Sequence, residues 1–509
     1  MIRKFGWILI IGALMVFAFT SSTTVIAGEE SCNERTNNTF EKLLECVTVD
    51  GVRQHQAAFQ SIADANGGNR APGTPGYDDS VDYVADTLEA AGYEVEFHGF
   101  DITFDPEAAL HQLAPIPAIY ETIAFNGTGI GSVTGQVIPV DLALVSPEFS
   151  TSGCETIDFN GLDFSGPADI ALIQRGACFF SVKAVNAEAA GAEAVVIFNQ
   201  GNDPARMGLI AGTAATLPDG SPSNLTIPVV GASFTDGVAL SQAGSIVFVN
   251  VDPPVQITQY NVLAELPGKN DGNVVMAGAH LDSVPGGPGI QDNGSGSAAI
   301  LEVALQMAEL KPFNTVRFAW WGGEEFRLVG STAYVNDLTQ AERDDIALYL
   351  NFDMIGSPNH VFFIYDGDDS DNVGAPAGPT GSAEIEKTFE KFFTMVGESF
   401  KGTDFSGRSD YGPFIAVGIP SGGLFTGAEG IKTIDEAAIW GGTAGDQYDP
   451  CYHLACDTYD NVNLTALDIN SDAVAYSVLQ YAMNTEAING VRGKGNFQIS
   501  PGNADMLVD

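Results

Sequence analysis

Strand ends that carry histidine or carboxylate side chains constrain the fold of this chain more than any other feature. One apolar run ends in His280 and another ends in Asp353, while a third is followed directly by Glu324 and Glu325. Short apolar runs bounded by turn residues are typical of buried strands. Ligand sites of open α/β sheets lie at the carboxyl ends of the strands, so we expect these side chains to converge.

The second half of the chain alternates strands and helices. Strands are expected near residues 274–280, 315–321, 346–353, 361–365 and 419–425. Helices are expected near residues 295–310, 325–337, 382–399 and 464–484, and two earlier ones near 52–62 and 80–91. This alternation favours an α/β fold with a mainly parallel mixed sheet sandwiched by helices.

Residues 108–255 differ in composition from the rest of the chain, which indicates a separate module. Short β-branched runs are broken there by Gly, Pro and Ser, and one helix is expected over residues 181–190. The sequence therefore predicts a β-rich module inserted in, or placed beside, a catalytic domain formed by residues 51–107 and 256–485.

The two ends of the chain read as separate from these domains. Residues 1–27 combine a basic start, an apolar run and a small-residue site ending in Ala27, which indicates a secretory signal peptide. An uncleaved membrane anchor is the alternative. Residues 28–50 are expected to be an N-terminal extension or pro-segment, and residues 486–509 a Gly- and Asn-rich C-terminal tail.

Six cysteines in a secreted chain fit three disulfides, since an oxidising compartment favours structural pairing. Proximity favours three pairs, although six cysteines allow about fifteen connectivities. The expected pairs are Cys32 with Cys46, Cys154 with Cys178, and Cys451 with Cys456.

The formal net charge of −44 limits the partners of this chain. Such a surface repels nucleic acid and anionic lipid, keeps the protein soluble and attracts cations. A salt-rich habitat and an ordinary acidic secreted protein both fit this charge.

Each candidate site residue also has a purely structural reading. His280 with Asp282 two residues later fits a metal-binding histidine oriented by a carboxylate, or a core histidine paired with an acid. Asp292 precedes a helix, so it fits a ligand or a helix cap. Of the adjacent acids Glu324 and Glu325, one can bind metal while the other acts as a base; alternatively, both stabilise a helix dipole.

Asp353 and His453 complete a set of five candidate ligands. A carboxylate in apolar surroundings, as at Asp353, is costly unless it is paired or coordinated. His453 lies between Cys451 and Cys456, where a zinc knot would have only three ligands and a disulfide is favoured. Two histidines and three carboxylates suit two zinc ions sharing a bridging carboxylate better than calcium or magnesium.

Several motifs, in order and spacing, resemble the secreted bacterial dizinc leucine aminopeptidases. The motifs are His280-Leu281-Asp282, Asp292-Asn293-Gly294-Ser295-Gly296, Gly323-Glu324-Glu325, Asn351-Phe352-Asp353-Met354-Ile355-Gly356-Ser357 and Tyr452-His453. The likeness covers about residues 52–93 and 256–483. It implies the zinc-peptidase fold.

The resemblance also implies a ligand set. His280 and Asp353 would hold one zinc, and Glu325 and His453 the other. Asp292 would bridge both, giving two Zn²⁺ per chain.

Further roles follow from the same resemblance. Glu324 would be the general base for a zinc-activated water. Asp282 would contact a metal ligand without binding the metal itself. Arg408 and Tyr452 match positions that contact the substrate, and Tyr452 would also stabilise the oxyanion. Tyr411 and Gly412 stand where some close relatives have His-Ala, a departure that concerns the local shape around Arg408 and not the metal site.

The inserted module resembles a protease-associated (PA) domain. The likeness rests on residues 166–176, on Cys178 and Lys183, and on residues 190–192 and 227–230. Such domains are β-rich and non-catalytic.

The sequence thus predicts a secreted, monomeric zinc aminopeptidase that acts on peptides with a free N-terminus. The resemblance implies a preference for Leu-like N-terminal residues. No nucleic acid is expected as a partner, and no membrane after signal cleavage. A carboxypeptidase or dipeptidase would need cationic residues for a substrate carboxylate, and Arg408 is the only obvious one. A non-catalytic binding ectodomain is disfavoured because all five ligands and Glu324 are present.

Overall fold

The computed structural model describes residue 32, residues 35–494 and residue 497. The expected signal peptide over residues 1–27 and most of the tail beyond residue 494 lie outside the described residues.

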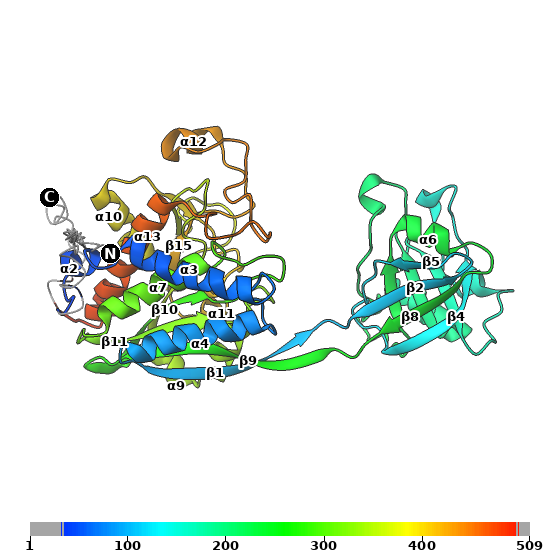
Figure 1. The fold of residues 1–509 in the computed structure, drawn as a ribbon, viewed down its shortest axis with the longest axis horizontal. Helices are drawn as coiled ribbons and strands as arrows, with labels where there is room; N and C mark the ends of the chain where they lie inside the picture. The colour runs from blue at the N-terminus through cyan, green and yellow to red at the C-terminus, as the bar shows by residue number, and fades with distance from the viewer. Residues whose placement is uncertain (1–31, 33–34, 495–496, 498–509) are drawn as a thin grey trace, which may run out of the picture. The chain divides into compact units, whose positions relative to one another are not determined.

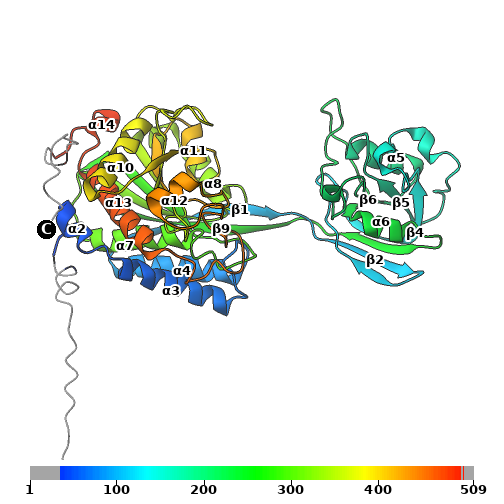
Figure 2. The same ribbon diagram turned by 90° about the horizontal axis from the view of Figure 1, so that it is seen from above.

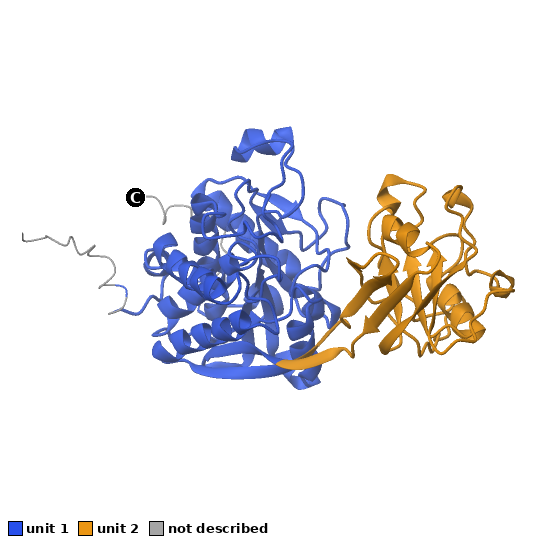
Figure 3. Ribbon diagram, turned by 45° about the vertical axis from the view of Figure 1, so that its right-hand side comes forward, with its two compact units in different colours: residues 1–100, 259–509 blue, residues 101–258 orange. Residues whose placement is uncertain are grey.

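The chain forms two compact units, shown in Figure 3. Unit 1 comprises residues 1–100 and 259–509, and unit 2 comprises residues 101–258. The chain leaves unit 1 within strand β1 (Glu94–Phe104) and returns within strand β9 (Val255–Leu266). Unit 2 is therefore an insertion in the sequence of unit 1.

Unit 1 is built on an eight-stranded mixed sheet (Figure 1), in the order β1-β9-β11-β10-β12-β15-β13-β14. The remaining strands are β10 (Asn270–His280), β11 (Asn314–Trp321), β12 (Ile346–Phe352), β13 (Phe363–Tyr365), β14 (Lys401–Thr403) and β15 (Ser421–Phe425). The four central strands β11, β10, β12 and β15 run parallel, whereas β9 is antiparallel to β11 and β13 is antiparallel to β15. The mainly parallel mixed sheet expected from the sequence is confirmed.

Helices cover both faces of this sheet, as Figure 2 shows from above. One face packs against α3 (Val49–Ala65), α4 (Pro75–Ala90), α7 (Gly294–Met307), α10 (Ser382–Val396) and α13 (Leu464–Met483). The other packs against α8 (Val329–Asp337) and α11 (Tyr411–Ala416), with α9 (Gln340–Asp345) beside β10 and β12. Successive side chains of a strand point to opposite faces, so Trp320 belongs to the first core and Trp321 to the second.

Unit 2 has a seven-stranded mixed sheet, in the order β3-β2-β8-β4-β5-β6-β7. Its strands are β2 (Ala108–Ala114), β3 (Ala118–Tyr120), β4 (Gly131–Val140), β5 (Asp169–Gln174), β6 (Ala194–Phe198), β7 (Val229–Ala232) and β8 (Ile246–Val251). Helix α5 (Phe180–Ala190) covers one face, and α6 (Phe234–Leu240) packs on the other. The sequence missed α6, because seven residues including a glycine carry little helical periodicity.

One predicted helix start was wrong. The sequence placed it near residue 325, but α8 begins at Val329. Arg327 and Leu328 have φ angles of 74° and 58°, in the left-handed region, so the chain cannot continue a right-handed helix through them. Glu324 and Glu325 consequently lie in a turn before the helix.

The described part of the N-terminal segment packs against unit 1. Helix α2 (Phe40–Leu44) places Leu43 in the core, and the ring of Phe40 stacks on Tyr476 at a centroid distance of 4.5 Å. The remaining short helices of unit 1 are α12 (Ile434–Trp440) and α14 (Glu486–Asn489). None of the helices in the described part of the chain is both long and apolar enough to span a bilayer.

All six cysteines are paired in disulfides. The bonds join Cys32 to Cys46, Cys154 to Cys178 and Cys451 to Cys456. These are the pairs that proximity in the sequence favours.

Candidate metal centre

The order of the central strands creates a crevice at one edge of the unit 1 sheet. Strand β10 lies between β11 and β12, so the chain adds strands first on one side of β10 and then on the other. Because all three strands are parallel, their carboxyl ends meet at the same edge. Such a switch in strand order is where open α/β sheets bind ligands.

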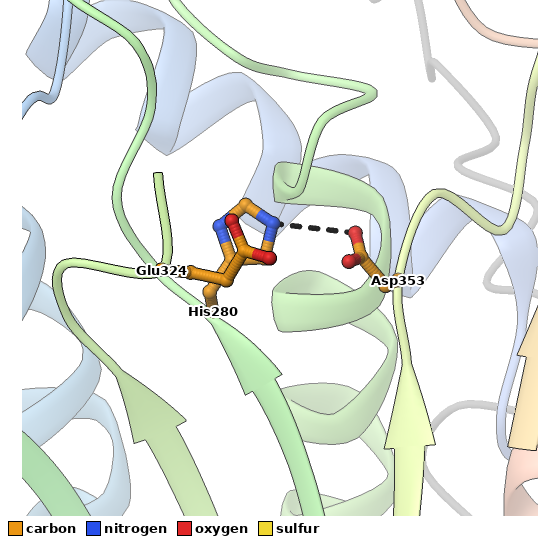
Figure 4. Close-up of side chains that lie close together, drawn as sticks. All are labelled: His280, Glu324 and Asp353. Carbon is orange, nitrogen blue, oxygen red and sulfur yellow. Dashed lines mark hydrogen bonds and ion pairs between the residues drawn. The ribbon is translucent and has the colours of Figure 1, made fainter. Parts of the chain in front are cut away.

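His280, the last residue of β10, is buried at this edge. Its Nε2 atom lies 3.2 Å from Oδ1 of Asp353 and 3.2 Å from Oδ1 of Asp292. Figure 4 shows that Glu324 also points toward the same imidazole and the Asp353 carboxylate. Donor atoms from His280, Glu324 and Asp353 lie within 4.8 Å of one another.

A second group of donors lies around His453. Its Nε2 atom is 3.0 Å from Oε2 of Glu325 and 3.3 Å from Oδ2 of Asp292. Asp292 therefore directs one carboxylate oxygen to each histidine, since its Oδ1 atom faces His280. The two groups of donors therefore share Asp292.

Asn293, the residue after Asp292, forms hydrogen bonds to two segments that carry candidate ligands. Asn293 caps α7 by accepting the N–H of Gly296 at 2.9 Å, and the same oxygen accepts the N–H of Met354 at 3.1 Å. Its amide nitrogen donates to the carbonyl of Phe352 at 2.9 Å. The start of α7 and the end of β12 are thereby fixed to each other.

Asp282 contacts more groups than the sequence led us to expect. The expected partner of its carboxylate is the other imidazole nitrogen of His280, and this nitrogen, Nδ1, lies 3.7 Å from Oδ1 of Asp282. The same nitrogen lies closer to the backbone carbonyl oxygen of Asp282, at 3.1 Å. The Asp282 carboxylate also accepts the backbone N–H groups of Glu324 at 3.2 Å and Glu325 at 3.3 Å. It positions both acidic residues.

Asp457 is a buried residue of this region that the sequence reasoning did not use. Its two carboxylate oxygens accept the backbone N–H of Gln291 at 2.8 Å and of Asp292 at 3.0 Å. Asp457 directly follows the loop closed by Cys451 and Cys456, so it joins the segment of His453 to that of Asp292. Its place one residue after that loop was the available signal.

Two further positioning residues also escaped the sequence reasoning. Arg70 is fully buried and donates to the carbonyl oxygens of Leu281, Pro288 and Gly289, which fixes the loop after β10. Ser409 donates to Oδ2 of Asp353 at 2.6 Å.

The electrostatics of the centre follow from burying several acids beside two histidines. Burial raises the pKa of Glu324 well above its usual range and that of Glu325 to about 7. Burial alone would lower the pKa of His453, but Asp292 and Glu325 raise it to about 10. Burial would raise the pKa of Asp292, but its hydrogen bonds with His280 and His453 lower it. Without metal, protons on His280 and His453 therefore balance part of the negative charge of these carboxylates. A bound metal cation can balance the same charge.

The donor set fits metal ions. The Oε1 atom of Glu325 is buried and has no hydrogen-bond partner among the described residues, as expected of a ligand oxygen. Imidazole and carboxylate ligands together suit zinc. A third cluster of possible metal ligands lies outside this centre. It consists of three carboxylates and contains no histidine: Asp366, Asp368 and Glu386.

A cavity of about 320 Å³ opens beside the centre. Four of the metal-site acids line it together with His453, Arg408 and Tyr452. Arg408 donates to the hydroxyl of Tyr452 at 3.1 Å and pairs with Glu429 at 2.8 Å. Tyr411, the departure noted in the sequence, is buried in the wall, and its hydroxyl accepts the N–H of Gly407 at 3.0 Å.

Comparisons with known proteins match both units of the chain. Residues 261–478 match the model of peptidase family M28, and residues 133–240 match that of the PA domain. The chain is 49% identical over 457 residues to an aminopeptidase of Pseudomonas aeruginosa, covering 88% of this chain and 83% of that protein. It is 42% identical over 452 residues to the probable lipoprotein aminopeptidase LpqL of Mycobacterium tuberculosis, covering 87% of each.

Solved structures also resemble this fold. An aminopeptidase from Aneurinibacillus sp. strain AM-1 aligns with a TM-score of 0.56 at 25% identity, covering 87% of this chain and 96% of that one. A zinc aminopeptidase from Bacillus subtilis aligns with a TM-score of 0.57 at 23% identity, covering 85% and 94%.

Proposed function

This chain is a metallo-aminopeptidase of peptidase family M28 with an inserted PA domain, and we propose that it removes N-terminal residues from peptides with two zinc ions per chain. The observation that carries the two-metal proposal is the position of Asp292 between His280 and His453. In this proposal His280 and Asp353 hold one ion, Glu325 and His453 hold the other, and Asp292 is shared.

Zinc bound here would supply a Lewis acid that polarises the scissile carbonyl and lowers the pKa of water. Glu324 lies among the donors but is proposed as the base. Its carboxylate lies beside His280 and Asp353, where it can take a proton from water and pass it to the leaving amine. Asp282 holds the backbone of Glu324 in place for this transfer.

Arg408 and Tyr452 are proposed to act on the substrate carbonyl. The Tyr452 ring stacks on His453 at a centroid distance of 3.8 Å, which orients its hydroxyl at the mouth of the centre. Because Arg408 donates to that hydroxyl, it favours the orientation in which the hydroxyl proton points away from Arg408 and can meet a developing oxyanion.

The cavity supports a preference for apolar N-terminal residues. Met354, Phe363 and Phe425 contribute apolar surface to its wall. A Leu-like side chain would bury its methyl groups there, while the free amino group of the substrate would meet the carboxylates of Glu324 and Asp353. A preference for Leu-like residues and a requirement for a free N-terminus follow.

We also propose that the protein acts outside the cytoplasm. Three disulfides are stable in an oxidising compartment, and a relative is described as a probable lipoprotein. The carboxypeptidase and dipeptidase alternatives are less favoured, because Arg408, the cation at the cavity, is already paired with Glu429.

Metal analysis combined with anilide hydrolysis tests this proposal. We expect two zinc ions per chain and hydrolysis of Leu-p-nitroanilide but not of its N-acetylated form. The Glu324→Gln variant should retain both ions and lose about 10²- to 10⁴-fold in kcat, since it removes a general base. Fewer than two ions, activity on blocked substrates alone or near-normal turnover of the variant would contradict the corresponding part of the proposal.

A further inference from the structure

The cavity beside the metal centre has a wall of aromatic rings. Phe363 stacks against Phe425 with their centroids 5.9 Å apart, and it meets the edge of Tyr448 at 5.5 Å. Tyr365 packs against Tyr411 at 4.8 Å. All five rings line the cavity, so it can enclose a long aliphatic side chain.

Strand topology places an acidic group beside this wall. Strands β13 and β14 are parallel, with Tyr365 opposite Thr403, and each is followed by an aspartate. The N–H of Asp366 donates to the carbonyl of Thr403 at 2.8 Å, so Asp366 and Asp404 emerge side by side at the strand ends. Of the two, Asp404 lines the cavity.

This acidic group contains five aspartates. The loop after β13 adds Asp368, Asp369 and Asp371 to Asp366 and Asp404. Among the described residues, none of these five aspartates is in an ion pair with a lysine, arginine or histidine. Burial raises the pKa of the Asp404 carboxyl, and the charges of Asp371 and Asp369 raise it further. A cation brought to Asp404 would relieve this repulsion.

Glu429 also lines the cavity outside the metal centre, but an ion pair already balances its charge. Glu429 forms an ion pair with Arg408 at 2.8 Å, and this pair is linked to Tyr452. Asp404 is thus the cavity carboxylate, apart from the metal-site acids, that is not in an ion pair among the residues described.

We propose that Asp404 is a specificity-determining residue, which lets the enzyme accept lysine or arginine as the N-terminal residue of its substrate. The aliphatic part of such a side chain lies along the aromatic wall, and its charged end reaches Asp404. This inference rests on the proposed aminopeptidase function and extends its substrate class from Leu-like to basic residues.

A matched pair of substrates isolates the charge. Lysine and norleucine p-nitroanilides have the same aliphatic stem, but only lysine carries an ammonium group. For Asp404→Asn we expect kcat/KM on the lysine substrate to fall about tenfold or more, through KM, because a charge contact remote from the scissile bond contributes to uniform binding. The value for norleucine should change less than about threefold.

A second variant distinguishes a direct contact between Asp404 and the substrate ammonium from the electrostatic potential of the whole acidic loop. Asp368 belongs to the same loop, is exposed and does not line the cavity, so Asp368→Asn removes one charge without removing the contact. It should leave the ratio of lysine to norleucine kcat/KM within about twofold of the wild-type value, as expected for a screened surface charge.

Each outcome bears on one claim. An unchanged ratio in Asp404→Asn, or equal losses in Asp404→Asn and Asp368→Asn, would overturn the assignment of Asp404 while leaving the aminopeptidase proposal intact. Failure of the zinc-loaded wild-type enzyme to hydrolyse either substrate would instead overturn the proposed function. Norleucine hydrolysis by Asp404→Asn serves as the check that the variant is folded.

Discussion

The substitution Asp457→Asn tests how the protein positions its bridging carboxylate. The two oxygens of Asp457 each accept one backbone N–H, from Gln291 at 2.8 Å and from Asp292 at 3.0 Å. Asparagine has nearly the same shape but replaces one acceptor oxygen with an NH₂ donor. One of the two buried N–H groups then faces a donor and loses its partner.

The cost of this change can be worked from those contacts. A buried N–H left without a partner costs about 1–3 kcal/mol. One of the two N–H groups belongs to Asp292, so the lost hydrogen bond also loosens Asp292 in its position between the two proposed metal ions. Part of the free-energy cost should therefore appear as weaker zinc binding. We therefore expect the Kd for zinc to rise about 10- to 100-fold, as for other residues that orient metal ligands.

A competition titration of zinc against a chelator measures this Kd, and kcat at saturating zinc shows whether the loaded centre still works. We expect kcat to remain within about tenfold of the wild-type value, since Asp457 does not touch the cavity. Asp472→Asn is the control, because burial also penalises the charge of Asp472, which lies on α13 outside the centre. An unchanged Kd, or an equal change in the control, would refute the reasoning.

Three other predictions concern pH, the disulfide and metal binding. Burial raises the pKa of Asp472 to about 8, and Asp468 adds to this effect. Because the folded-state pKa then exceeds the unfolded value of about 3.9, the folded protein loses stability from this group as pH rises from about 4 to about 8. Asp472→Asn should accordingly raise the unfolding temperature at pH 8 but not at pH 4, and an equal gain at both would contradict this. Replacing Cys451 and Cys456 together with serine frees the loop that carries His453 and removes about 2 kcal/mol of chain constraint. Zinc affinity should therefore fall by up to about 30-fold in the same competition titration, and wild-type affinity would show that the loop is held by other contacts. Since the pKa of His453 without metal is about 10, zinc binding at pH 7 should release protons, which calorimetry in buffers of different ionisation enthalpy detects; heats independent of the buffer would exclude this.

Much of the fold could be predicted because its signals are local. Apolar runs bounded by turn residues located the strand that ends at His280 and the strand that ends one residue before Asp353, and the alternation with helices predicted the parallel sheet. The start of α8 could not be predicted from periodicity, because it depends on the left-handed conformation of Arg327 and Leu328. His280 and Asp353 could be named because parallel strands bring their carboxyl ends to one edge, whereas Asp292 and His453 lie in turns and were assigned by the resemblance.

The sequence by itself thus determined which side chains are available for chemistry and which end of the sheet they occupy. Only the tertiary structure decided how they are held, because those contacts join segments far apart in the chain. Asp457 accepts the N–H of Asp292 across 165 residues, and the carboxylate of Asp282, besides lying 3.7 Å from His280, accepts the N–H groups of Glu324 and Glu325. The adjacency of Asp404 and Asp366 likewise arises from strand pairing, which no local pattern encodes.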